Sequence, residues 1–183
     1  MSSRTGRANL AKTTLQVLDV GRYVNPQGES VSIAEAMEAC NAASEYFASG
    51  ELEQLRAEVV SAPCPYAETR FELENETTLE GAHALALRGN AGRIGVLNFA
   101  SAKNPGGGFL GGSQAQEESL ARSSALYGSL TRFHSEYYEA HRNQKDAFYS
   151  DRMIYSPDCP VFRDDAGTFL DASYQVDFLT SPA

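Results

Sequence analysis

The sequence predicts an α/β layered fold, and three observations lead to it. In the second half of the chain, short apolar segments that suit strands alternate with segments of helical periodicity. One such strand is followed at once by a loop with five glycines and then by a helix. With 183 residues, 42% of them hydrophobic and 21% charged, the chain can bury the core of one domain.

The N-terminal part of the chain is expected to be mainly helical. Residues 8–20 carry apolar side chains at helical spacing, and residues 25–28, Asn-Pro-Gln-Gly, are typical of a turn. Ser32 is followed three positions later by Glu35, a capping-box pattern that predicts a helix from residue 33 onward.

A second, charged helix is expected over about 50–58, after Ser49-Gly50. Residues 63–65, Pro-Cys-Pro, then end the helical region. We therefore expect a helical N-terminal extension over residues 1–65 and a core over residues 66–183.

The core region is expected to begin with an alternating segment. Residues 71–74, Phe-Glu-Leu-Glu, alternate as in a half-exposed strand, and residues 78–88 have the composition of a helix. The apolar run 94–99 predicts a buried strand. A long helix is expected over about 114–131, and a polar, tyrosine-rich helix over about 135–146.

The C-terminal part predicts two further strands, over residues 153–155 and 175–179. Between them, residues 163–167, Arg-Asp-Asp-Ala-Gly, are typical of a turn that joins a hairpin. The second of these strands is expected to be internal to the sheet.

Charge and composition exclude several classes of protein. A net charge of −9 argues against nucleic-acid binding, because phosphate contacts depend on clustered Lys and Arg. No apolar run can span a bilayer and no apolar signal segment begins the chain, so we expect a cytoplasmic protein without a membrane partner. Three cysteines without CxxC spacing predict reduced thiols. No metal pattern involves the histidines, and we expect solvated helix positions for His134 and His141.

The glycine-rich loop is the first feature that predicts chemistry. It has no GxGxxG register and no GK[ST], which weakens a Rossmann reading and excludes a P-loop. Residues 105–108, Pro-Gly-Gly-Gly, leave the backbone amides open to close approach by a ligand. Such a group of amides favours an anion such as a diphosphate.

The helix after the loop predicts a second part of the same site. Ser113 suits an N-cap with Gln116 three positions on, so the helix dipole is expected to point at the loop and to favour anions. Glu117 and Glu118 then diverge by about 100° and are expected to have different roles. The alternative is that both acids only offset the helix dipole. Asn98 and Asn104 could likewise serve only Asx turns.

The spacing of these motifs resembles a known family. Residues 106–108, Gly-Gly-Gly, seven intervening residues and Gln116-Glu117-Glu118 are similar to the signature of poly(ADP-ribose) glycohydrolases. Asn98-Phe99-Ala100-Ser101 and Asn104-Pro105 resemble the bacterial-type branch.

The resemblance implies a macrodomain-like, three-layer α/β/α fold with a mixed sheet and a helical N-terminal extension. It also implies hydrolysis of the ribose–ribose O-glycosidic bond in poly(ADP-ribose), a reaction that needs no metal or cofactor. The implied partners are poly(ADP-ribose), ADP-ribose and poly(ADP-ribosyl)ated proteins. Glu118 matches the general acid and base, with a pKa expected to be raised by burial, and Glu117 matches the carboxylate that holds the scissile ribose. The matching substrate-binding residues are Gly106, Gly107, Gly108, Asn98, Asn104, Gln116 and Phe109.

The negative charge of the chain also predicts where a polymer is attacked. A broad basic groove is excluded, so one terminal unit is expected to be held by amides, the helix dipole and a few cations such as Lys103. We therefore expect attack mainly at the chain end.

Alternative functions stay open at this stage. Members of the family are longer and carry a second glycine-rich loop, for which this sequence offers no candidate, since Gly167 is the only glycine after Gly128. The C-terminal strands and helix are thus expected to be missing, which leaves a non-catalytic ADP-ribose-binding module or an inactive remnant as the alternative. A third hypothesis is that the chain is a phosphatase or deacetylase-like hydrolase that acts on an ADP-ribose derivative.

Overall fold

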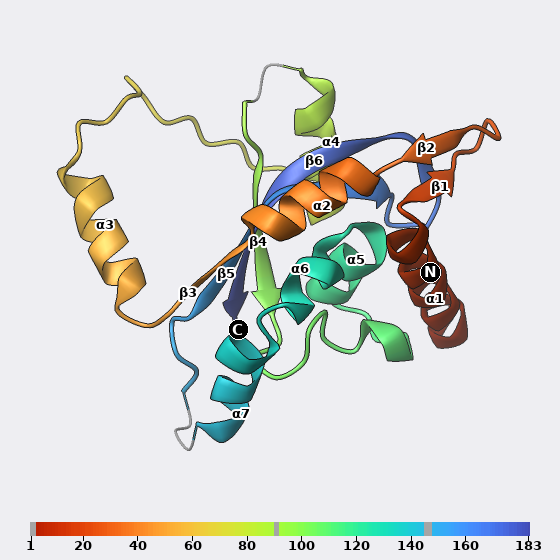
Figure 1. Ribbon diagram of the computed structural model, residues 1–183. Helices are drawn as coiled ribbons and strands as arrows, with labels where there is room; N and C mark the ends of the chain where they lie inside the picture. Colours follow the sequence, from red (N-terminus) through yellow and green to blue (C-terminus); the bar gives the residue numbers. More distant parts are fainter. Residues whose placement is uncertain (1–2, 90–91, 145–147) are drawn as a thin grey trace.

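The computed structural model describes residues 3–89, 92–144 and 148–183 (Figure 1). The strands are β1 Arg22–Val24, β2 Ser30–Ser32, β3 Glu45–Phe47, β4 Gly95–Ala100, β5 Met153–Arg163 and β6 Phe169–Pro182. The α-helices are α1 Arg4–Val20, α2 Ala34–Ala43, α3 Glu51–Ser61, α4 Thr78–Leu87, α5 Gln116–Ser123, α6 Leu126–Thr131 and α7 Ala140–Asn143. Two further helical elements are a short 3-10 turn, η1 Phe109–Gly111, and a π-helix, η2 His134–Glu139.

The main sheet is mixed and has the strand order β3–β5–β6–β4. The pairs β3–β5 and β5–β6 are antiparallel, whereas β4 and β6 are parallel. The turn at 163–167 joins β5 to β6, with the amide of Gly167 donating to the carbonyl of Asp164 at 3.1 Å. The predicted mixed α/β fold, the hairpin and the internal position of the last strand are thus confirmed.

The edge strand β4 differs from the buried strand that its apolar run predicted. Its side chains alternate, with Val96, Asn98 and Ala100 buried on one face. On the other face Leu97 and Phe99 are 43% and 57% exposed. One side of β4 therefore packs on the core, and the prediction of burial on both faces was wrong.

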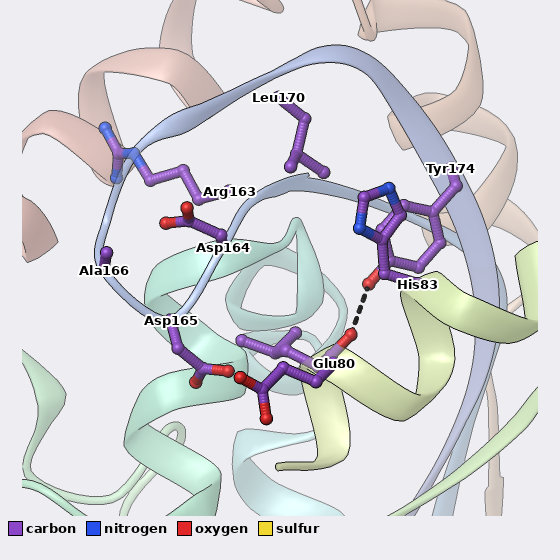
Figure 2. Close-up of a pocket in the computed structure, with 9 residues that line it drawn as sticks. Glu80, His83, Arg163, Asp164, Asp165, Ala166, Leu170 and Tyr174 are labelled. Atoms are coloured by element: carbon purple, nitrogen blue, oxygen red, sulfur yellow. Dashed lines mark hydrogen bonds between the residues drawn. The ribbon is translucent and has the colours of Figure 1, made fainter. Parts of the chain in front are cut away.

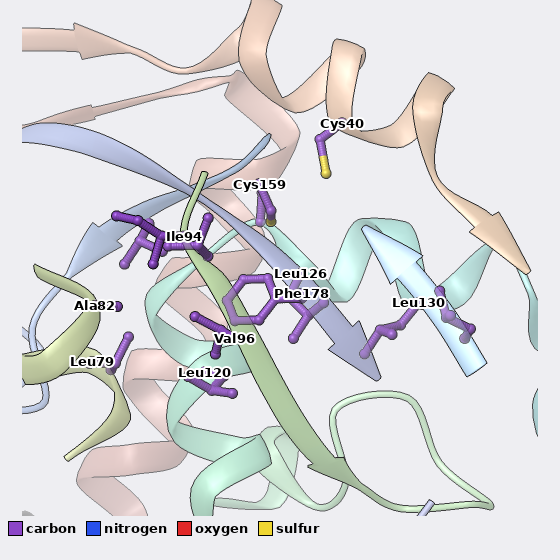
Figure 3. Close-up of a cluster of buried hydrophobic side chains, with 14 of the residues drawn as sticks. Cys40, Leu79, Ala82, Ile94, Val96, Leu120, Leu126, Leu130, Cys159 and Phe178 are labelled. Carbon is purple, nitrogen blue, oxygen red and sulfur yellow. The ribbon is translucent and has the colours of Figure 1, made fainter. Parts of the chain in front are cut away.

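The main hydrophobic core lies between the sheet and helices that come from distant parts of the sequence (Figure 3). Cys40 of α2, Leu79 of α4 and Leu120 of α5 meet Val96 of β4 and Phe178 of β6. Each of these helices and strands contributes only a few apolar side chains. The apolar side chains of one element are therefore buried only when the other elements pack against it.

Two predicted helix boundaries were wrong. Ser32 lies in β2 rather than at a helix N-cap, and α2 begins after Ile33 without a side-chain cap. The following segment leaves the helix at Ser44 and pairs as β3 with the first three residues of β5. Strand pairing therefore overrode the helical periodicity of this segment.

The connection between α3 and α4 is also unlike the prediction. Residues 71–74 form no strand, and Phe71 and Leu73 are 93% and 97% exposed. Helix α3 has no buried residue and stands apart from the sheet in Figure 1. The sheet nevertheless includes β3, so it crosses the boundary expected at residue 65.

The predicted helix over 114–131 is broken into α5 and α6. Ser124 takes an extended conformation and forms a β-bridge with Val161, and the amide of Ala125 donates to the carbonyl of Pro160 at 3.0 Å. The helix expected over 135–146 is η2 followed by α7; residues 145 and 146 lie outside the described residues. None of the helices among the described residues combines the length and apolarity needed to cross a membrane.

Helix α1 holds the glycine loop from one side. Arg4 and Arg7 donate from Nε to the carbonyls of Gly111 and Gly112, at 3.0 and 2.9 Å. A small cluster of Ala11, Phe109 and Ala121 fills the space between the helix and the loop. The loop shape thus depends on the N-terminal helix.

Gly112→Ala is expected to destabilise the fold by about 2 kcal/mol, measured by urea unfolding. Gly112 has a φ of +75°, and a Cβ there would lie 2.1 Å from the backbone oxygen of Arg4. Gly28→Ala is the matched control, because Gly28 also has a positive φ, +84°, but no neighbour within 4 Å. Equal losses for both variants would show that backbone strain alone, and not the packing of α1, sets the cost.

Candidate active site

The glycine loop lies between the carboxyl end of β4 and helix α5. Gly106 and Gly107 have φ values of +66° and +59°, in the left-handed region that favours glycine. A Cβ on Gly106 would lie 2.8 Å from the ring of Phe109 and 3.1 Å from Ala121. The first two glycines are thus required by the turn and by close packing, and they keep the loop against α5.

Helix α5 places both glutamates against this loop. The amide of Gly108 donates to Oε1 of Glu118 at 2.9 Å, and the amide of Ser101 donates to Oε2 of Glu117 at 2.7 Å. Both side chains are buried, with exposed fractions of 9% and 4%. The two adjacent carboxylates therefore reach different parts of the same loop.

Burial determines the electrostatics of Glu117. Burial raises the pKa of Glu117 to about 7, and the charge of Glu118 adds to the rise. Hydrogen bonds from the Ser101 amide, the Asn98 side chain and the Gly106 backbone act in the opposite direction. The raised pKa of Glu117 was not predicted from the sequence.

The start of α5 does not use the predicted capping box. Ala115 is the N-cap and makes no side-chain cap, and Gln116 occupies the first helical position. The Gln116 side chain instead accepts from the amide of Phe99 at 2.9 Å and donates to the carbonyl of Leu97 at 2.8 Å. It pairs with the open edge of β4 as a neighbouring strand would, which fixes α5 against the sheet.

The remaining predicted site residues lie in different environments. Asn98 is fully buried and donates to Oγ1 of Thr180 at 3.2 Å. Asn104 is exposed and accepts from Nη2 of Arg142 at 3.3 Å. Phe109 is fully buried, with its ring 4.9 Å from that of Tyr127, so in this structure it packs in the core beneath the loop.

Sequence reasoning missed three side chains near this site. Tyr137 and Tyr138 of η2 are fully buried, and after burial itself the charge of Glu117 raises the pKa of both. Arg142 of α7 donates to the carbonyl of Lys103 and so ties this segment to the loop after β4. In the sequence, the only indication of these side chains was the tyrosine-rich composition of residues 135–146.

The histidines offer no metal site. Among residues 3–89, 92–144 and 148–183 there is no cluster of His, Cys, Asp and Glu side chains that could hold a metal ion. His141, expected in solvent, is 2% exposed, with Nδ1 2.8 Å from the carbonyl of Tyr137 and Nε2 2.9 Å from Oγ of Ser150. Its solvated position was a wrong prediction, because the tyrosine-rich segment packs inward.

A cavity of about 500 Å³ lies away from the glutamates, between α4 and the β5–β6 turn (Figure 2). It is lined by Glu80, Asp164 and Asp165, and by His83 stacked on Tyr174 with ring centroids 5.2 Å apart. Arg163 also borders it, but its guanidinium is buried against α1, where it donates to Thr13 and Thr14. We place the candidate active site at the glutamates and the loop, since these groups can bind an anion and move a proton.

Comparisons with known proteins identify the family of the chain. The family described as "Microbial-type PARG, catalytic domain" matches residues 11–164, on both sides of the boundary expected at residue 65. No curated protein is similar enough to the chain to count as a match.

Several solved structures are similar to the chain over most of its length. Poly(ADP-ribose) glycohydrolase from Thermomonospora curvata is 47% identical, with a TM-score of 0.89; the match covers 97% of this chain and 64% of that one. The same enzyme bound to the inhibitor ADP-HPD is 46% identical, with a TM-score of 0.84 and coverages of 97% and 62%. The Deinococcus radiodurans enzyme in complex with ADP-ribose is 42% identical, with a TM-score of 0.72 and coverages of 80% and 57%.

The chain thus spans less than two thirds of the length of these solved enzymes. The family match includes the loop, α5 and strands β3, β4 and β5, and the structural similarity to the Thermomonospora curvata enzyme covers 97% of the chain. By this evidence the chain belongs to the family of microbial-type poly(ADP-ribose) glycohydrolase catalytic domains.

Proposed function

We propose that this chain hydrolyses the ribose–ribose O-glycosidic bonds of poly(ADP-ribose) and releases ADP-ribose, with Glu118 as general acid and base. Poly(ADP-ribose) on modified proteins is the proposed substrate. Family membership supports this activity, as do the solved relatives that hold ADP-ribose or ADP-HPD.

One observation carries the proposal. A Cβ on Gly107 would lie 2.5 Å from Oε1 of Glu118 and 3.0 Å from Oε2 of Glu117. Gly107 therefore lies directly against both carboxylates, and a side chain at this position would have to displace them. The loop amides of Gly107, Gly108 and Phe109 donate within the protein, so the N-terminus of α5 is the group that favours a diphosphate next to the acids.

The proposed chemistry needs one proton donor at the leaving oxygen. Glu118 gives its proton to the ribose oxygen as the glycosidic C–O bond breaks, and the other ribose passes through an oxocarbenium-like state. Water then attacks that carbon, and the Glu118 carboxylate takes back a proton. The net reaction consumes one water and regenerates the acid.

Glu117 has a different role in this proposal. Its neutral form is favoured up to a pH of about 7, because burial raises its pKa to that value. A neutral carboxyl can both donate to and accept from ribose hydroxyls. We propose that Glu117 holds the ribose whose bond is cut, while the Ser101 amide fixes its other oxygen.

The chain is expected to release ADP-ribose from the polymer end, so that polymers shorten one unit at a time and oligomeric fragments from internal cleavage are not early products. The reason is its net charge of −9, which allows it to hold one terminal unit but no long stretch of polymer. Chromatography of end-labelled poly(ADP-ribose) during the reaction measures this, with salt varied between runs. Early fragments of mixed length, or a salt dependence that requires more than about two phosphate contacts, would contradict chain-end attack.

A second candidate is a module that binds ADP-ribose without hydrolysing it. The observation that favours it is the coverage, since the chain matches 64% and 57% of the lengths of two solved enzymes. Calorimetric binding of ADP-ribose together with no release from the polymer would support this candidate over the enzyme.

A further inference from the structure

The side chain of Gln116 lies along the open edge of the main sheet. β4 is the last strand in the order β3–β5–β6–β4, so one of its edges has no strand as a partner. On that edge, Oε1 of Gln116 accepts from the amide of Phe99 at 2.9 Å, and Nε2 donates to the carbonyl of Leu97 at 2.8 Å. In a parallel pair, one residue of the neighbouring strand bonds to the same two groups. The carboxamide therefore takes the place of one strand residue.

The next residue of α5 binds the next amide in the same direction. Amides two residues apart along a strand point to the same side, so the amide of Ser101 follows that of Phe99. Oε2 of Glu117 accepts from the Ser101 amide at 2.7 Å. Gln116 and Glu117 thus bind two successive amides. The bonds of Gln116 fix where α5 lies along β4, and with it the place of the Glu117 carboxylate.

The start of α5 depends on these bonds, because its N-cap, Ala115, makes no side-chain cap bond. A third bond of Gln116 runs from Nε2 to Oγ1 of Thr78 at 3.1 Å, and Thr78 is the first residue of α4. Gln116 thus joins the first turn of α5 to both β4 and α4. Since an uncapped helix start is held less firmly, the turn that carries both glutamates relies on this side chain.

These bonds leave little of Gln116 for a substrate. Both hydrogens of Nε2 are donated, to Leu97 and to Thr78, and Oε1 already accepts one bond. A ligand that used these groups would have to break the contacts with the sheet. The hydrogen bonds therefore favour a role within the protein over the substrate-binding role that the family resemblance implies.

We propose that Gln116 is a positioning residue, whose carboxamide docks the first turn of α5 on the open edge of β4 and so places both glutamates against the loop. The inference rests on the function proposed above. From this turn Glu118 accepts from the Gly108 amide at 2.9 Å. Gln116 touches no reacting atom in this scheme, and it acts through Glu117 and Glu118.

The test uses Gln116→Met in the full chain, which removes all three bonds and keeps a flexible side chain of similar length. Gln114→Met is the matched control, because Gln114 lies just before α5 and bonds to Ser119 and Arg122 of that helix. Three quantities are measured for each chain: amide hydrogen exchange by NMR, kcat and KM for release of ADP-ribose from the polymer, and the affinity for ADP-ribose.

In Gln116→Met, the amide of Phe99 is expected to exchange about tenfold faster, the size of one lost hydrogen bond. The amides of Ser101 and Gly108 are expected to exchange faster as well, although their own acceptors on Glu117 and Glu118 are unchanged. We expect kcat to fall about a hundredfold, as a misplacement of about 1 Å can cause, with ADP-ribose affinity within a few fold of wild type. The control should match the wild type in all three measurements.

A second variant, Gln116→Glu, tests rescue by a similar group. A neutral carboxyl can accept from the Phe99 amide and donate to the Leu97 carbonyl, as the carboxamide does, whereas a carboxylate only accepts. Compared with wild type at the same pH, the protection of the Ser101 amide should be lost at pH 8 and regained at pH 4. A loss that is the same at both values of pH would contradict docking through the Leu97 bond. This variant also keeps the inference testable if Gln116→Met fails to fold.

Either faster exchange at Phe99 alone or an unchanged kcat in Gln116→Met would overturn the inference, because Gln116 would then bind the edge without placing the acids. An unchanged kcat with tenfold weaker ADP-ribose binding would indicate direct contact with the substrate instead. The exchange measurement needs no turnover, so it tests the inference even in a chain that only binds ADP-ribose. The proposed function fails separately, if Glu118→Gln releases ADP-ribose from the polymer as fast as the wild type does.

Discussion

Glu117→Gln is expected to stabilise the chain by about 2–3 kcal/mol at pH 8 and to leave its stability unchanged near pH 4. Burial raises the pKa of Glu117 from 4.5 to about 7 in the folded state. The folded chain then binds more protons than the unfolded chain between these values, so the free energy of unfolding falls as pH rises from about 4.5 to 7. Glutamine can still accept from the Ser101 amide but never ionises.

Urea unfolding of both chains at pH 4, 6 and 8 measures this difference. Glu53→Gln on the exposed helix α3 shows what the loss of a surface carboxyl does by itself. A stability gap that is the same at all three values of pH would mean that Glu117 ionises in the folded chain as it does in the unfolded one, which contradicts the electrostatics described for the site.

Glu118→Gln is expected to lower the release of ADP-ribose from poly(ADP-ribose) about a thousandfold, within the range of general acid–base catalysis. The amide oxygen of glutamine can still accept from the Gly108 amide at the position of Oε1, so the loop keeps its shape. The affinity for ADP-ribose should therefore stay within a few fold of the wild-type value. A parallel loss of affinity and turnover would instead assign Glu118 to the shape of the loop.

The sequence-based predictions were most accurate where the signal is local. Residues 163–167 contain the residue types that favour a turn, and the β5–β6 hairpin forms around this turn as predicted. The glycine loop and the glutamates that follow it are close in sequence, so their meeting in space follows from a strand, a loop and a helix in succession. Family resemblance added the chemical roles.

Distant contacts produced the errors. Periodicity continues through Ser124, but its β-bridge to Val161 breaks the helix there. Gln116 looked like part of a capping box, yet the free edge of β4 offers its side chain an amide and a carbonyl together. Residues 71–74 alternate as a strand would, and no strand of the described sheet pairs with them. The burial of both Tyr137 and Tyr138 could not be predicted, because nothing in the sequence indicates the π-helix.

The central claim is that the loop and α5 carry an acid catalyst for glycosidic hydrolysis. The most direct measurement is single-turnover release of ADP-ribose from poly(ADP-ribose) by the wild-type chain, Glu118→Gln and the Glu53→Gln control, with ADP-ribose affinity measured in parallel. We predict release by the wild type and the control, and nearly complete loss with retained binding for Glu118→Gln. Equal release by the wild type and Glu118→Gln would contradict the claim.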